Sequence, residues 1–260
     1  QGMRCIRQII QEWSEFYGIE TTLEEFDVRG KKEVPGLTYD VYVSSGGPGS
    51  PVESEGSDWE KAYFTWFEQV REWNSDTVNS HKKHVFFICH SFQLICRYLN
   101  IGRLSKRIKT SFGVYPVHVT LDGQQDGVLQ GLGDPFYVVD SRDYQVTTPD
   151  FDNINMHGAK IFCIEKYRPH VPYEQALMAV RFNKYMIGTQ FHPEADAAGM
   201  SMYLQTEEKK KTVIDNHGEL KWRSMIEQLN DPDKIMWTYA HILPNFLSEA
   251  VGKYKRALVA

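Results

Sequence analysis

The chain alternates between stretches whose apolar residues have helical spacing and shorter stretches with the spacing of strands. At the centre, residues 85–88 form a run of apolar β-formers that ends directly at Cys89. Such a short run is typical of a buried strand in a parallel sheet. A helix-like run, residues 92–99, follows with almost no loop between. The pattern therefore predicts a strand that turns directly into a helix, with Cys89 at the corner.

Helical periodicity is also found near both ends of the chain. Residues 3–17 and 59–73 each place apolar side chains on one face, and after residue 200 the segments 207–216, 220–229 and 235–254 have the same period. Strand-like segments occupy the part between. We predict strands at residues 39–44, 85–89, 112–121, 136–140, 160–166, 177–182 and 186–191, with a weaker candidate at 20–27.

This order of elements predicts an α/β layer fold with an antiparallel ribbon or annex, not a strict βαβ repeat. We expect a flavodoxin-like three-layer sandwich with a mostly parallel central sheet. Residues 1–198 are expected to form this domain, and residues 199–260 a helical C-terminal extension packed on it. Since a doubly wound fold places a strand before helix 3–17, we expect that first strand to be missing from the given chain.

Composition narrows the class of protein. The 29 Lys and Arg residues against 34 Asp and Glu residues give a net charge of −5 without a basic face, which disfavours nucleic acid as a partner. The apolar runs are too short to span a bilayer, and no signal-peptide pattern opens the chain. The four cysteines do not have the spacing of a secreted disulfide framework. We therefore predict a cytoplasmic protein with reduced cysteines and no membrane association.

The position of Cys89 indicates nucleophilic chemistry. A thiol at a helix N-terminus has its pKa lowered toward the reactive thiolate. A base is found in His192, at the end of the strand 186–191, and Glu194 follows two residues on, with Pro193 between them. Residues two apart in extended backbone project to the same side, so Glu194 can orient His192 toward a thiol. The carboxyl ends of strands, where such groups gather in open α/β sheets, would bring Cys89 and His192 together.

A third segment, Gly46-Gly47-Pro48-Gly49, follows the strand 39–44. Glycines let the backbone approach a substrate closely. The N–H groups of Gly47 and His90 could therefore stabilise the oxyanion of an acyl-transfer intermediate.

Together these segments resemble the class I glutamine amidotransferase family. Its pattern runs Ser-Gly-Gly-Pro-Gly-Ser, then Gly-x-Cys-x-Gly-x-Gln, then Gly-x-Gln-Phe-His-Pro-Glu, and the resemblance covers about residues 39–194. It implies that Cys89 attacks the carboxamide carbon of glutamine, that His192 moves the protons, and that Glu194 holds His192. It further implies an oxyanion hole of Gly47 and His90, a γ-glutamyl thioester, and no cofactor or metal in the amidase step.

The resemblance also implies the substrate-binding groups. Gln93 would help to hold the bound glutamine, and the segment with Ser141, Arg142, Asp143 and Tyr144 looks like the family's substrate-binding loop. Arg142 and Tyr144 replace the family's usual His and Asp. Arg142 is either a solvated loop charge or a group near a substrate carboxylate.

The likeness extends to the amidotransferase part of GMP synthase, here as a stand-alone chain. No ATP-handling segment is visible in these 260 residues, so a synthetic use of the ammonia would place the acceptor, and its synthetase, on a separate chain. The sequence names neither that acceptor nor the oligomeric state.

Two residues depart from the family pattern, because Phe87 and Ser91 stand where glycine is usual. Small residues flank a nucleophile elbow since the turn is tight. Ser91 is small enough, and Phe87 must point away from the turn into the sheet packing. These departures keep two alternatives open: a hydrolase of γ-glutamyl peptides or conjugates with a more open pocket, and a binding module without turnover.

Two plainer interpretations stand beside the catalytic one. Cys89 alone could be a buried core thiol. A metal site of His81, His84, Cys89 and His90 is disfavoured because the spacing fits no common zinc pattern.

Overall fold

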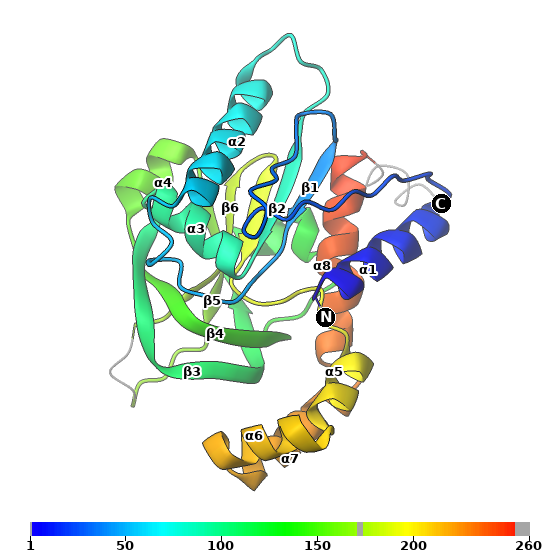
Figure 1. Cartoon of the computed structure of the whole chain (residues 1–260), viewed down its shortest axis with the longest axis vertical. Helices are drawn as coiled ribbons and strands as arrows, with labels where there is room; N and C mark the ends of the chain where they lie inside the picture. The colour runs from blue at the N-terminus through cyan, green and yellow to red at the C-terminus, as the bar shows by residue number, and fades with distance from the viewer. Residues whose placement is uncertain (1, 171–173, 253–260) are drawn as a thin grey trace.

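The protein folds around one mixed sheet with helices on both faces (Figure 1). The computed structural model describes residues 2–170 and 174–252. Its sheet has seven strands in the order β1-β2-β7-β6-β5-β3-β4. The strands are β1 (Val41–Ser44), β2 (His84–Ile88), β3 (Gly102–Val119), β4 (Phe136–Pro149), β5 (Lys160–Glu165), β6 (Leu177–Asn183) and β7 (Met186–Thr189).

Eight α-helices accompany these strands in the described residues. They are α1 (Gly2–Tyr17), α2 (Asp58–Ser75), α3 (His90–Tyr98), α4 (Phe151–His157), α5 (Ala197–Leu204), α6 (Glu207–His217), α7 (Glu219–Asn230) and α8 (Ile235–Ala250). The layered α/β architecture and the antiparallel ribbon predicted from the sequence are confirmed. The segment 20–27 forms no strand, and residues 253 and 254 of the helix predicted for 235–254 lie outside the described residues.

The sequence pattern suggested a mostly parallel sheet, but most of its strand pairs are antiparallel. Of its six strand pairings, only β1–β2 and β2–β7 are parallel, and the other four are antiparallel. For β6 and β7 the reason is the length of the connection. Parallel neighbours need a crossover of a dozen or more residues, whereas β6 and β7 are joined by a tight turn and so must run in opposite directions.

Separate hydrophobic clusters cover the two faces of the sheet. On one face, α2 and α3 pack their aromatic and aliphatic side chains on β2 and β6, with Phe67, Phe87, Phe92 and Phe182 at the centre. On the other face, α1 and α8 pack against β2 and β7. Phe246 of α8 lies in this second cluster, with its ring 5.2 Å from that of Phe86.

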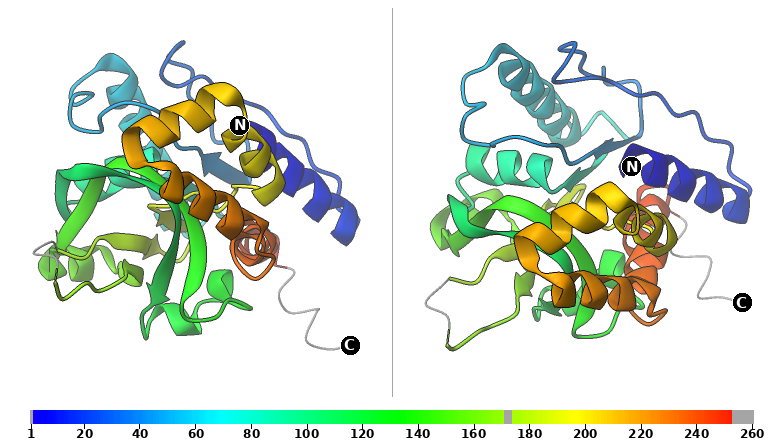
Figure 2. Two further views of the ribbon diagram at one scale, coloured as in Figure 1. Left: turned by 90° about the horizontal axis from the view of Figure 1, so that it is seen from below. Right: turned by 60° about the horizontal axis from the view of Figure 1, so that its bottom comes forward.

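A third cluster holds the helices α5, α6 and α7 against the outer part of the β3–β4 ribbon. Val114 and Val139 of the ribbon contact Leu204, Met225 and Leu229 of these helices. Figure 2 shows the three helices lying across the ribbon, next to the N-terminal end of α1. The division of the chain at residue 198 stays a prediction.

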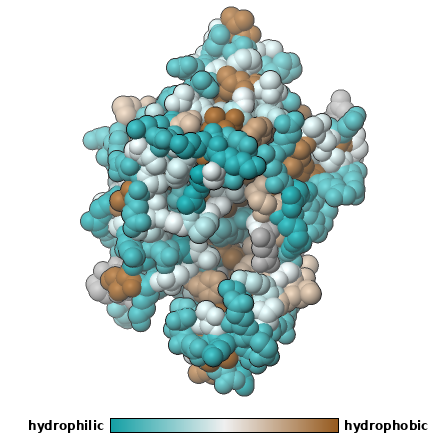
Figure 3. Space-filling model, in the orientation of Figure 1, coloured by the Kyte–Doolittle hydropathy of each residue, from teal (hydrophilic) through white to brown (hydrophobic). Residues whose placement is uncertain are grey.

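The surface gives little indication of a large apolar interface on the face drawn in Figure 3, where hydrophobic side chains are scattered among hydrophilic ones. In the part of the chain that the structure describes, no helix is both long and apolar enough to cross a membrane.

Candidate active site

Cys89 occupies a strained corner between β2 and α3. Its backbone angles, φ 50° and ψ −98°, lie in a region that non-glycine residues rarely adopt. Strain of this kind persists only where the surrounding structure imposes it. The Cys89 N–H donates to the Thr189 carbonyl on β7 at 2.7 Å, and the Ser91 hydroxyl accepts from the Ile88 N–H at 2.8 Å. The corner is therefore held from both sides.

The two departures from the family pattern fit this turn. Ser91 also donates to the Ser44 carbonyl at 2.6 Å, which ties the start of α3 to β1. Phe87 is fully buried and its ring lies 5.9 Å from the ring of Phe67, away from the corner, as the sequence required. Gly188 lies opposite Phe87 in the sheet, and a Cβ there would come within 3.1 Å of the Phe87 Cβ. Gly188 thus leaves room for the main chain and Cβ of Phe87 and for the ring of Phe92.

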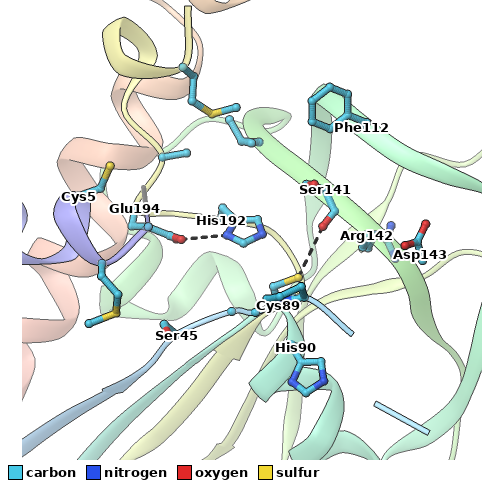
Figure 4. Close-up of a pocket in the computed structure, with 18 of the residues that line it drawn as sticks. Cys5, Ser45, Cys89, His90, Phe112, Ser141, Arg142, Asp143, His192 and Glu194 are labelled. Carbon is cyan, nitrogen blue, oxygen red and sulfur yellow. Dashed lines mark hydrogen bonds and ion pairs between the residues drawn. The ribbon is translucent and has the colours of Figure 1, made fainter. Parts of the chain in front are cut away.

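His192 and Glu194 follow β7 and face the corner. The His192 N–H donates to the Val139 carbonyl at 2.9 Å, so β4 fixes the backbone of the histidine. Its side-chain Nδ1 lies 2.9 Å from Oε1 of the buried Glu194. Figure 4 shows the imidazole between the Glu194 carboxylate and the Cys89 sulfur. The structure thus brings together the three residues that the sequence singled out.

The electrostatics of this group favour a protonated imidazole. Burial lowers the pKa of His192, but the Glu194 carboxylate and the Cys89 sulfur outweigh it, and the pKa is raised well above its ordinary value. A cation beside a thiol stabilises the thiolate. The Cys89 thiol itself lies 3.8 Å from the Ser141 carbonyl, in reach of a weak hydrogen bond.

The glycine segment after β1 lies directly against this pair. A Cβ on Gly46 would come within 3.2 Å of the Cys89 Cβ and 3.0 Å of the His192 Cε1, tighter than ordinary van der Waals contact, so a larger residue would have to displace these side chains. Gly47 follows, and His90 begins α3. Both Gly47 and His90 line the cavity that also contains Cys89.

The other residues expected to bind substrate lie on one wall of the same cavity, of about 630 Å³. Gln93 donates its side-chain amide to the Tyr144 carbonyl at 3.0 Å, which fixes that wall to α3. Asp143 is exposed and accepts from the Thr110 hydroxyl at 2.5 Å. Residues 141–146 are not a loop, because they belong to β4.

Arg142 is not a solvated charge. It is buried, its Nε lies 2.9 Å from both carboxylate oxygens of Asp140, and Nη2 lies 3.7 Å from Glu165. Among the described residues its Nη1 has no hydrogen-bond partner, and this atom is itself buried from solvent. Arg142 is one of the residues that line the cavity, and a buried donor left unpaired is costly.

The far wall of the cavity consists of residues that the sequence analysis did not single out. This wall includes Gly2, Met3 and Cys5 of α1 and Met200 and Tyr203 of α5. The sequence predicts a helix at residues 3–17 from its apolar period. That period does not tell which end of the helix faces the cavity.

The α1 side of this wall carries charged groups as well. Cys5 lies 3.4 Å from a carboxylate oxygen of Asp196, which also forms an ion pair with Arg4. In the described residues no group of three or more His, Cys, Asp and Glu side chains is placed to hold a metal ion.

The fold and this geometry define an α/β protein with a nucleophile elbow, whose cysteine faces a histidine–carboxylate pair. Comparison with known families is in agreement. A model of the family "Glutamine amidotransferase class-I" matches residues 4–208. The chain belongs to the class I glutamine amidotransferase family.

Solved structures share the fold at low sequence identity. A glutamine amidotransferase from Thermotoga maritima is 16% identical, with a TM-score of 0.67 over 94% of this chain and 91% of that one. A putative GMP synthase subunit from Thermoplasma acidophilum is 13% identical, with a TM-score of 0.54 over 97% and 91% of the two chains. The glutaminase domain of CTPS from Trypanosoma brucei, with bound acivicin, is 14% identical, with a TM-score of 0.57 over 96% and 88%. A comparison with curated proteins found no match.

Proposed function

We propose that this protein hydrolyses the side-chain amide of glutamine to glutamate and ammonia. The Cys89 thiolate attacks the carboxamide carbon, and the N–H groups of Gly47 and His90 stabilise the resulting oxyanion. His192 gives its proton to the leaving nitrogen, so ammonia departs and a γ-glutamyl thioester remains. His192 then takes a proton from water as the water attacks the thioester, which releases glutamate and restores the Cys89 thiolate and the protonated His192.

One observation supports this proposal above the others. Cys89 lies at a strained corner beside a histidine whose second nitrogen is 2.9 Å from a buried carboxylate. A structural core thiol needs neither the strain nor the oriented base. The substrate would be held on the wall formed by Gln93 of α3 and by Ser141, Arg142, Asp143 and Tyr144 of β4, which all line the cavity.

The experiment is ammonia release from glutamine by the purified chain. We expect steady release by the wild type and none above background from Cys89→Ala. A glutamine-derived chloroketone should label the wild type at Cys89 and leave Cys89→Ala unlabelled. Labelling without ammonia release would favour the alternative of a binding module without turnover, and the absence of both would contradict the proposal.

A second candidate function is the hydrolysis of γ-glutamyl peptides or conjugates. The observation in its favour is that the cavity continues past His192 to α1 and α5, where Met3, Met200 and Tyr203 line it. Ammonia needs no such space, whereas a larger amine leaving group does. Comparing kcat/KM for glutamine with that for γ-glutamyl amides of apolar amines separates the two functions.

The use of the ammonia is also a proposal. By likeness to the GMP synthase protein of Thermoplasma acidophilum, we propose that a separate synthetase chain receives it, in the cytoplasm. Neither nucleic acid nor a membrane is expected as a partner, and the amidase step needs no cofactor because the chain supplies nucleophile, base and oxyanion donors.

A further inference from the structure

The glycine segment beside the nucleophile is held from its outer side by Arg29. The Arg29 guanidinium donates to the Pro48 carbonyl. It also lies against the two glycines that flank Pro48, since a Cβ on Gly47 or Gly49 would come within 2.9 and 2.8 Å of its nitrogens. Gly46, one residue before, faces Cys89 and His192. The segment is therefore placed between the nucleophile on its inner side and Arg29 on its outer side.

Arg29 also contacts an aromatic ring that lies beside the nucleophile elbow. Its guanidinium carbon lies 5.4 Å from the centre of the Trp59 ring, and the Trp59 ring lies 6.4 Å from that of His90, tilted by 36°. His90 is the residue after Cys89. The series Arg29–Trp59–His90 thus leads from the glycine segment to the start of α3.

The charges of these groups are compatible with such packing. Burial of the ring, together with the nearby Arg29 and Arg97 charges, lowers the pKa of His90 to about 4. The His90 ring is therefore neutral at neutral pH and does not repel the guanidinium.

The far end of the segment has its own anchor. Arg97, on α3, donates to the Pro51 carbonyl and forms a largely buried ion pair with Glu60. Between this anchor and β1, the backbone contains three glycines, which have little conformational preference of their own. An oxyanion donor must lie within about 0.5 Å of its productive position. A contact at the middle of the segment is therefore needed to hold the Gly47 amide there.

We propose that Arg29 is a positioning residue that holds the Gly47 amide toward the sulfur of Cys89. The inference rests on the proposed function, since it assigns to Gly47 the role of an oxyanion donor. Arg29 itself touches neither Cys89 nor the substrate wall of β4, so it acts through the glycine segment.

The test compares Arg29→Ala with the wild type in ammonia release and in alkylation of Cys89 by iodoacetamide. Alkylation is a displacement at carbon that forms no oxyanion, so it reports the nucleophile alone. We expect kcat to fall about tenfold, part of the loss known for removal of a whole oxyanion donor. KM and the alkylation rate should stay within about twofold of the wild type, because the substitution changes neither the ground-state binding of glutamine nor the Cys89 nucleophile.

Two further variants make the test specific. Arg29→Lys keeps a cationic donor for the Pro48 carbonyl and should retain more of kcat than Arg29→Ala. Arg7→Ala is the matched control. Arg7 is an exposed arginine of α1, and its partner Glu25 lies shortly before Arg29 in the chain. This variant should leave kcat unchanged. Arg29 is exposed, so its loss leaves no buried group unpaired and the variant should fold.

The outcomes are distinguishable from those of the proposed function. An unchanged kcat in Arg29→Ala overturns the inference, as does a parallel fall in kcat and alkylation rate, which would mean that the elbow itself had been disturbed. Equal activity of Arg29→Lys and Arg29→Ala would also overturn it. If the wild type releases no ammonia, the proposed function fails first and the inference fails with it.

Discussion

Gly46 lies against both the nucleophile and its base. We predict that Gly46→Ala lowers kcat for glutamine about 10²-fold, because the added methyl displaces His192 and a misplacement of about 1 Å is sufficient for such a loss. The methyl would lie 3.0 Å from His192 and 3.2 Å from Cys89, tighter than ordinary contact, so these side chains would have to shift. Steady-state kinetics with thermal unfolding of the same variant checks the prediction.

Gly36→Ala is the matched control, since a Cβ there meets no atom within 4 Å. It should leave both kcat and the melting temperature unchanged. A Gly46→Ala enzyme as active as this control would contradict the geometry of the site.

Glu194 determines the protonation of His192. Because the carboxylate raises the pKa of His192, the imidazolium persists to higher pH, and it is lost as the pH rises through that pKa. We predict that Glu194→Gln lowers this pKa, moves the alkaline limb of the kcat/KM profile to lower pH, and lowers the maximum about 10²-fold. A pH–rate profile of both enzymes tests this. An alkaline limb at the same pH in both would assign it to a different group.

At the scale of elements, the β2–α3 corner depends on its neighbour β7. A Cβ on Gly188 would come within 2.9 Å of Phe92 and 3.0 Å of the Phe87 carbonyl. We predict that Gly188→Ala destabilises the fold by about 1–3 kcal/mol through overpacking. Denaturant unfolding measures the change, and Phe92→Ala in the same chain, which removes the nearest side-chain atom, should offset part of it. Strict additivity of the two changes would contradict the contact between them.

The same corner shows what can be predicted from a sequence. The strand 85–88 and the following helix are predictable from a local apolar pattern, and Phe87 must point into the sheet because no other direction leaves the turn intact. Arg142 could not be placed this way. Its burial depends on Asp140 on its own strand and on Glu165 of β5, and the second of these lies beside it only after the sheet has formed.

At the scale of the whole molecule, α8 completes the core although it comes late in the chain. Phe246 is 1% exposed and packs on Phe86 of β2. We predict that Phe246→Ala lowers the free energy of unfolding by about 3–5 kcal/mol. Met236→Ala, on the same helix but 53% exposed, should change it by less than about 0.5 kcal/mol. Denaturant unfolding of both variants checks this, and similar losses from the two would show that α8 is not part of the core.

The sequence by itself determined the local chemistry: a cysteine at a strand–helix corner, a histidine with a carboxylate two residues on, and a glycine segment after a strand. These are short-range patterns, and short-range geometry decides them. Only the tertiary structure decided that most strand pairs are antiparallel, that Arg142 is buried, and that α1 and α5 form the far wall of the cavity. Those features depend on contacts between residues far apart in the chain, which neither periodicity nor spacing encodes.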